Sequence, residues 1–168
     1  MAAALSTLYV RSVAEPALKG FLAAIANFEI FLDQNVNTLT SGNYAGTGVV
    51  NGANQTGSSI LTNGWTANRT LFNGGEVVTF AGVNAINPVN YQSTGALANF
   101  VITGPVTSDG AGNATLTISP AIVTSGAYQT VSASPANGAA VSVISGAANS
   151  VLAKNLGFVR DAFGLVTV

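Results

Sequence analysis

The 168-residue sequence contains no cysteine and no histidine. Without cysteine neither a disulfide framework nor a thiolate metal site can form, and the redox compartment cannot be inferred. Without histidine the commonest general base and the commonest metal ligand are both missing. We therefore predict that the protein is not an enzyme and that it holds no cofactor and no metal.

Charged residues are also scarce. They make up 7% of the chain, against about 25% in typical soluble proteins. Five cations against six acids leave a formal net charge of −1, which is too little positive charge to neutralise many phosphates of a nucleic acid. A low net charge also favours association between copies. We predict no sequence-specific binding to nucleic acid.

Long apolar runs are missing too. The apolar N-terminal segment is interrupted by Arg11, Glu15, Pro16 and Lys19, so no run reaches the roughly 18 to 20 residues of a membrane span, and we predict no signal peptide. Leu18, Phe21, Leu22 and Ile25 follow at helical spacing, which predicts a helix over Glu15–Phe28. The letters "FEIFLDQN" then alternate as in a half-buried strand.

The rest of the chain is rich in Asn, Thr, Ser and Gly, and its patterns predict β structure. Residues 35–68 are predicted to form loops, short edge strands and turns, with Asn-Gly turns at 51–52 and 63–64. Clearer strands follow, each bounded by Gly, Pro or Asn: Glu76–Ala81, Leu97–Thr103, Ala114–Ser119, Tyr128–Ala133, Ala139–Ile144 and one or two within Asn155–Val168. Turns are expected around Asp109–Gly110, Gly112–Asn113 and Pro135–Gly138. Short strands at regular spacing predict an antiparallel sandwich or barrel.

Several possible chemical sites have simpler structural explanations. The carboxylates Asp109 with Asp161, or Glu29 with Asp33, could pair, although solvated surface and turn positions are favoured. The segment "SDGAGNAT" resembles a calcium loop, yet it has one carboxylate, so a plain hairpin is favoured. The glycine-rich segments lack a P-loop lysine. The aromatic residues Tyr44, Trp65 and Tyr91 could stack on a sugar, pack internally or contact a protein partner.

The order of several short motifs resembles one known family. They are "GGEVVTFAGVNAINPV", "ALANFVIT", "GNATLTISPAIV", "AYQTVSASPANGAAVSV" and "NLGFVRDAFGLVTV". In this order they resemble the C-terminal half of tailed-bacteriophage major capsid (coat) proteins, of the short-tailed phage type with a six-stranded β-barrel inserted in the Hong Kong 97 capsid fold. The resemblance covers about residues 15–168 and is strongest from Gly74 onward. Asn27 and Glu29 depart from the Gly and Asp that are usual in that family.

The resemblance implies a mainly β fold, with a small antiparallel barrel, flanking strands and one N-terminal α-helix belonging to a capsid-type α+β fold. It implies a shell-type helix and strand over 1–34, a barrel with long Asn/Gly-rich loops over 35–150, and strands returning to the shell over 151–168. The family's N-terminal arm, extended loop and spine helix are not recognisable here. We therefore expect a coat subunit or a part of one, with a capsid decoration protein derived from the coat protein as the alternative.

The function implied is structural: a subunit of a phage head that assembles with its own copies and other capsid proteins, in the host bacterial cytoplasm, and resides in the virion. A carbohydrate or cell-surface binding module carried by the virion is the alternative. The candidate contact residues are Tyr44, Trp65, Asn84, Pro88, Tyr91, Arg160 and Asp161, with the first two in an exposed segment and the next three in the Asn84–Ala96 loop. The glycines expected at tight turns of the barrel are Gly74, Gly75, Gly82, Gly110 and Gly138.

Overall fold

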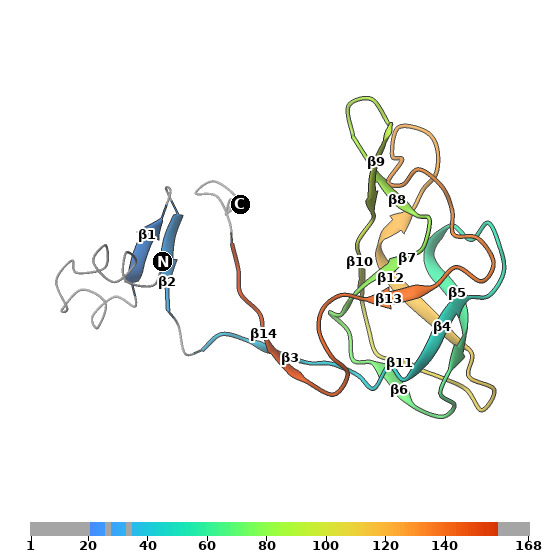
Figure 1. The fold of residues 1–168 in the computed structure, drawn as a ribbon, viewed down its shortest axis with the longest axis horizontal. Coiled ribbons are helices and arrows are strands. Elements are labelled where there is room, and N and C mark those ends of the chain that lie inside the picture. The colour runs from blue at the N-terminus through green and yellow to red at the C-terminus, as the bar shows by residue number, and fades with distance from the viewer. Residues whose placement is uncertain (1–20, 26–27, 33–34, 158–168) are drawn as a thin grey trace, which may run out of the picture. The chain divides into compact units, whose positions relative to one another are not determined.

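The computed structural model describes residues 21–25, 28–32 and 35–157, all in strands, turns and loops (Figure 1). The chain divides into two compact units: Thr38–Leu152, called the barrel unit here, and a second unit made of Met1–Asn37 and Ala153–Val168. The strands are β1 (Phe21–Ile25), β2 (Phe28–Phe31), β3 (Thr38–Thr40), β4 (Gly46–Val50), β5 (Gly57–Trp65), β6 (Thr70–Phe72), β7 (Val77–Phe80), β8 (Asn84–Ile86), β9 (Ser93–Leu97), β10 (Phe100–Ile102), β11 (Val106–Thr107), β12 (Ala114–Ile122), β13 (Val141–Val143) and β14 (Val151–Ala153).

The barrel unit is built on a six-stranded antiparallel sheet with the strand order β13-β7-β10-β12-β5-β4. Its two outer strands nearly meet, because Val49 forms an antiparallel bridge with Ala140, and the Val50 N–H donates to the Ala139 carbonyl at 2.9 Å. The sheet is therefore an almost closed barrel. Closure satisfies the backbone groups that an open sheet would leave unpaired at its edges.

Alternation of side chains along the strands determines which face lies inside. In β12, Ala114, Leu116 and Ile118 are buried while the residues between them are exposed. In β10, Phe100 and Ile102 are buried on both sides of exposed Val101. Successive side chains of a strand point to opposite faces, so this period of two places one apolar row from each strand in the barrel interior.

The core of the barrel unit is one continuous apolar cluster, and its aromatic residues make specific ring contacts. The rings of Phe80 and Phe100 are tilted by 56° with centroids 5.3 Å apart. Trp65 meets Phe72 edge to face, with centroids 5.7 Å apart. Aromatic pairs prefer such tilted and edge-to-face arrangements, and each pair joins two different strands or turns of the barrel.

The clearer sequence patterns are confirmed. The strands predicted from Glu76, Leu97, Ala114 and Ala139 correspond to β7, β10, β12 and β13. The turn at 109–113 closes with a hydrogen bond from the Asp109 N–H to the Asn113 carbonyl, and the Ala139 N–H donates to the Ala136 carbonyl across the 136–139 turn. Of the glycines expected at turns, Gly74, Gly75, Gly82 and Gly138 have positive φ, whereas Gly110 does not; Gly112 has it instead, at 79°.

The helix predicted over Glu15–Phe28 is not observed in its described part. Residues 21–25 form β1, which pairs antiparallel with β2, so that Ala24 faces Glu29. Helical spacing of apolar residues is only a weak indicator of a helix, because the same residues can form a strand when a neighbouring strand is available to pair with them. Residues 15–20 and 26–27 lie outside the described part of the chain. No helix long and apolar enough to cross a membrane occurs among the described residues.

The prediction of loops and edge strands for residues 35–68 is wrong for β5. This nine-residue strand pairs on both sides, with β12 and with β4. Its inward row contains Thr62, whose hydroxyl donates to the Ala114 carbonyl at 2.8 Å; a polar residue stands where the pattern needed an apolar one. The Asn63–Gly64 pair also lies inside β5, at a register shift against β4, and is not a hairpin turn.

Two further strand predictions differ from the structure. Within the predicted strand Tyr128–Ala133 the only pairing is an isolated bridge from Val131 to Ala85, because the flanking residues form a projecting loop. Residues 155–157 have no regular structure, and the remainder of the predicted Asn155–Val168 strands lies outside the described residues.

Candidate subunit-contact surface

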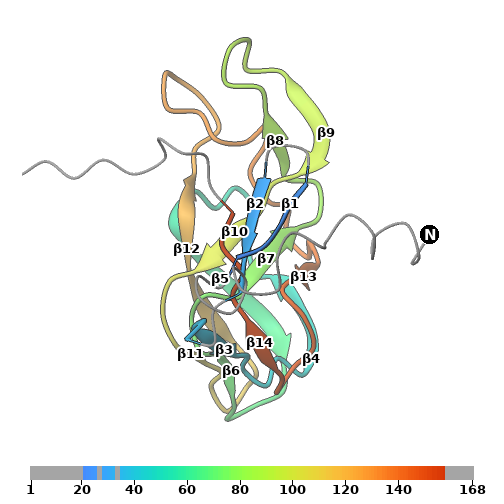
Figure 2. The ribbon, with the colours of Figure 1, turned by 90° about the vertical axis from the view of Figure 1, so that its left-hand side faces the viewer.

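A hairpin formed by β8 and β9 projects from the barrel, and the loop at its end is tightly organised (Figures 1 and 2). The side-chain oxygen of Asn87 accepts a hydrogen bond from the Val89 N–H at 2.9 Å, and Asn90 likewise accepts one from the Gln92 N–H at 3.0 Å. Asparagine favours such turns because its side chain bonds the backbone two residues on. The loop is thereby held by its own sequence.

A second loop, over residues 124–129, lies beside this hairpin. The Ser132 N–H donates to the Asn84 carbonyl at 2.9 Å, and the Tyr91 hydroxyl donates to the Ala127 carbonyl at 3.4 Å. The base of this loop is fixed by Thr130, whose hydroxyl donates to the Ala121 carbonyl at 2.7 Å and accepts from the Val123 N–H at 3.0 Å. We call residues 87–92 and 124–129 together the tip.

The tip exposes large apolar and aromatic side chains without any charge. Val89 and Tyr128 are each 87% exposed, and Tyr91 is 43% exposed. The sequence has no charged residue between Glu76 and Asp109, or between Asp109 and Lys154. Tyrosine is enriched at the energetically important positions of protein interfaces. The tip therefore combines contact-forming side chains with an absence of electrostatic repulsion.

The tip also contains a strained backbone conformation, at Tyr91. Tyr91 has a φ of 57°, in the left-handed region, where a residue with a side chain is destabilised by roughly 1–2 kcal/mol. A hydrogen bond from the Tyr91 N–H to the Asn87 carbonyl, at 2.8 Å, holds this conformation. Strained positions of this kind concentrate at functional surfaces.

The predicted contact residues are distributed unevenly. Pro88 and Tyr91 are exposed on the tip, and Asn84 is half-buried at its base in β8. Arg160 and Asp161 lie outside the described residues. Tyr128, which is as exposed as any apolar side chain of the tip, was not predicted; the signal for it was an aromatic residue after Ser-Gly-Ala in a segment without charge.

The expectation of an exposed segment around Tyr44 and Trp65 is wrong. Trp65 is only 6% exposed, and its ring N–H donates to the Thr62 hydroxyl at 2.8 Å. Tyr44 is half-buried, with its ring stacked on Phe72 and its hydroxyl donating to the Gly146 carbonyl. Burial, together with the negative charge of Glu76, raises the pKa of Tyr44. Both residues act in packing, because large aromatic surfaces are driven inward by the hydrophobic effect.

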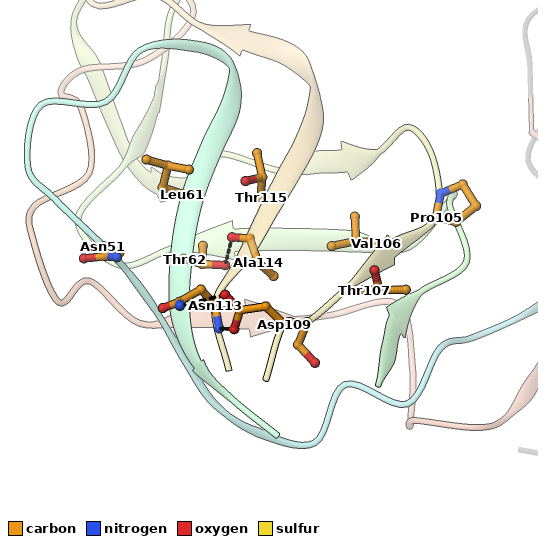
Figure 3. Close-up of a pocket in the computed structure, with 11 residues that line it drawn as sticks. Asn51, Leu61, Thr62, Pro105, Val106, Thr107, Asp109, Asn113, Ala114 and Thr115 are labelled. Carbon is orange, nitrogen blue, oxygen red and sulfur yellow. Dashed lines mark hydrogen bonds between the residues drawn. The ribbon is translucent and has the colours of Figure 1, made fainter. Parts of the chain in front are cut away.

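A polar groove of ≈ 480 Å³ lies on the barrel near β5, β11 and β12 (Figure 3). It is lined by Asn51, Leu61, Thr62, Pro105, Val106, Thr107, Ser108, Asp109, Asn113, Ala114 and Thr115. Its one carboxylate, Asp109, is occupied by its own turn: one oxygen accepts from the N–H groups of Ala111 and Asn113 at 2.8 Å, and the other from the Asn113 side chain at 2.9 Å. The plain hairpin favoured over a calcium loop accounts for these contacts.

These hydrogen bonds make a testable prediction about Asp109. The bond from the Asn113 side chain and those from the backbone lower the pKa of its carboxyl group. The stability that the turn gains is therefore complete above the pKa of the unfolded chain and is lost as pH falls through the lower pKa of the folded protein. An NMR titration of the carboxyl carbon should show the lowered value, and Asn113→Ala should raise it toward normal. An unchanged value in the variant would contradict this role.

Comparison with known proteins identifies the family. The family model described as P22 coat protein, gene protein 5, matches residues 21–168, well over half of the chain. The chain belongs to the P22 coat protein family. A search of the curated proteins found no match.

Membership of the P22 coat protein family establishes the general role. The chain is a structural protein of a phage capsid, located in the virion, that assembles with itself and other capsid subunits. The resemblance inferred from the order of the sequence motifs is therefore confirmed, and so is a barrel-like antiparallel sheet within it. Among the described residues, no group of three or more His, Cys, Asp or Glu side chains is placed to hold a metal.

Proposed function

We propose that the tip is a contact surface through which one copy of this coat-type subunit meets a neighbouring copy in the phage head. Family membership supplies the setting, in which each chain is surrounded by copies of itself. The exposed Val89, Tyr91 and Tyr128 supply apolar area. A surface without charge allows identical copies to approach each other, whereas a charged one would make identical faces repel.

The remaining features of the proposal rest on the composition of the chain and on its resemblance to coat proteins. The subunit acts without a catalytic residue or a cofactor, does not read nucleic-acid sequence, and is assembled in the host bacterial cytoplasm. The segment 1–34 belongs to a shell-type capsid fold, and the segment 151–168 returns the chain to that fold. In support, five cations are too few for extensive phosphate binding.

The alternative of a carbohydrate or cell-surface binding module has less support. Two of the three aromatic residues that it needs are engaged internally: Trp65 is buried and Tyr44 stacks on Phe72. Sugar recognition uses exposed aromatic faces, so neither residue is available. Saturable binding to a glycan array by the purified protein would favour this alternative over assembly.

Replacing Val89 and Tyr128 with serine tests the proposed contact. We expect the double variant to keep its free energy of unfolding within about 0.5 kcal/mol, as exposed substitutions usually do. We expect the yield of closed particles to fall at least about tenfold, because each subunit repeats the lost contact and weak contacts act together. Negative-stain microscopy and sedimentation of particles from expressing cells would measure this.

The matched control is Leu61→Ser with Ile144→Ser. These side chains are 52% and 54% exposed and belong to β5 and to the segment directly after β13, so the control also removes exposed apolar area, although less than the tip variant does. It should assemble as the parent does. Normal particle yield from the tip variant would exclude the tip as a contact. A parent protein that stays monomeric at high concentration and is never found in virus particles would contradict the assembly role itself.

A further inference from the structure

The carboxyl group of Glu76 is completely buried just before β7, and three backbone N–H groups converge on it. One of its oxygens accepts from Gly42 at 2.8 Å and from Asn73 at 2.9 Å, and the other accepts from Gly74 at 2.8 Å. Asn73 and Gly74 belong to the adjacent turn, but Gly42 lies 34 positions earlier in the chain. Glu76 therefore joins the barrel to the segment by which the chain enters it.

The residue before Gly42 binds the segment by which the chain leaves the barrel. The Ser41 hydroxyl donates to the Ala147 carbonyl at 2.7 Å and accepts from the Ser150 N–H at 2.9 Å. The backbones add bonds from the Ser41 N–H to the Ser150 carbonyl and from the Asn149 N–H to the Gly42 carbonyl. We call residues 38–44 and 146–152 the neck; they include β3 and the first two residues of its partner strand β14 (Figure 1).

The incoming part of the neck lies directly on the barrel backbone. A Cβ atom at Gly42 would be 2.1 Å from the Leu71 carbonyl oxygen, so only glycine fits there. Ser41 is 2% exposed, and the Asn43 N–H donates to the Thr70 carbonyl at 3.0 Å. The Glu76 side chain is itself completely buried, so water does not readily replace a donor that its carboxyl group loses here.

We infer that Glu76 is a positioning residue that fixes the conformation of the neck. Its two oxygens can accept from three N–H groups only while Gly42 stays beside the 73–74 turn, so any other path for the incoming segment removes one of the three donors from a buried carboxyl group. Through its hydrogen bonds to Ala147 and Ser150, Ser41 fixes the outgoing segment relative to the incoming one. The entry and exit segments then have the same conformation in every copy of the barrel unit. Equivalent packing in a closed shell requires subunits of the same conformation; this last consequence rests on the proposed assembly function.

Glu76→Gln tests the role of the carboxyl group in the unassembled protein. Glutamine has nearly the same shape, but its NH₂ group would face either the Gly74 N–H or those of Gly42 and Asn73, and in both orientations the negative charge that strengthens all three bonds is lost. We expect hydrogen exchange at the amides of Ser41, Asn149 and Ser150 to accelerate by about tenfold to a hundredfold, because hydrogen bonds to charged groups are strong. None of these amides bonds to Glu76 directly, so faster exchange at them would show that the hydrogen bonds within the neck open more often.

The barrel reference amides are those of Ala98 and Thr103, which bond to the carbonyls of Val83 and Thr117, and we expect their exchange to change little. Glu29→Gln, the same chemical change at an exposed side chain, should alter neither set. Ser41→Ala should accelerate Asn149 and Ser150 while leaving Gly74 protected. Uniform acceleration of neck and barrel amides in Glu76→Gln, or none at the neck, would overturn the inference.

A second measurement separates the neck from assembly. If both the inference and the proposed function hold, Glu76→Gln should give particles of irregular size or shape by microscopy, whereas Glu29→Gln should give particles like those of the parent. A mobile neck with regular particles would overturn the link to shell geometry and leave the exchange result standing. Failure of the parent to form particles would count against the proposed function alone.

Discussion

Phe100→Ala is expected to lower the free energy of unfolding by about 3–5 kcal/mol, the usual range for truncating a buried phenylalanine. Phe100 is completely buried in β10, and its ring contacts that of Phe80 across the barrel core. Alanine would leave a cavity that the rigid antiparallel sheet can close only in part. Because small proteins have about 5–15 kcal/mol of stability in total, much of the barrel's stability depends on this one ring. Urea unfolding followed by circular dichroism would measure the loss.

Val101→Ala is the matched control for this prediction. Val101 is the next residue of the same strand, faces outward and is 40% exposed. It should lose about 1 kcal/mol or less, since only part of its side chain leaves water on folding. Equal losses for the two variants would show that the barrel interior is not the main source of stability.

Gly112→Ala is expected to destabilise the protein by about 2–5 kcal/mol, from two separate causes. With φ at +79°, an alanine is strained by roughly 1–2 kcal/mol. In addition, its Cβ would lie 2.3 Å from the Trp65 carbonyl oxygen, and relieving such an overlap adds about 1–3 kcal/mol. The Trp65 N–H bonds to the Gly112 carbonyl, so the turn cannot move away without breaking this contact. Thermal and urea unfolding would measure the loss.

Gly138→Ala isolates the first of these causes. Gly138 has nearly the same φ, +78°, and its N–H is also bonded within the barrel, but nothing lies within 4 Å of a Cβ placed there. This variant should show only the backbone strain. If the two variants lost equal stability, the close approach of the 109–113 turn to Trp65 would have no energetic importance.

The burial of Glu76 is a feature that the sequence does not predict. The residue was visible as the only charged residue in an apolar run between glycines, yet that pattern does not say whether the side chain faces water or the interior. Its partners include Gly42, 34 positions away. A local pattern contains no information about such a distant donor, so the role of Glu76 follows from the folded chain alone.

In the tip and the aromatic residues, too, local sequence predicts some features, whereas others depend on residues far away in the chain. Of the loop expected over Asn84–Ala96, only residues 87–92 form a loop, held by the local hydrogen bonds of Asn87 and Asn90, whereas the residues on either side belong to β8 and β9. That Tyr128 comes beside it depends on the pairing of Ser132 with Asn84, between distant segments. Trp65 was expected to be exposed because polar residues surround it in sequence, but the alternation of β5 turns it inward.

The sequence by itself determined the absence of histidine and cysteine chemistry, the mainly β class, most of the barrel strands and the family. These depend on composition and on patterns spanning a few residues, which the chain carries whatever its tertiary structure. Tertiary structure decided that residues 57–65 form a paired strand, that residues 21–25 form a strand, and which polar groups are buried. Each of those outcomes depends on partners far away in the chain, and only packing determines which partners meet.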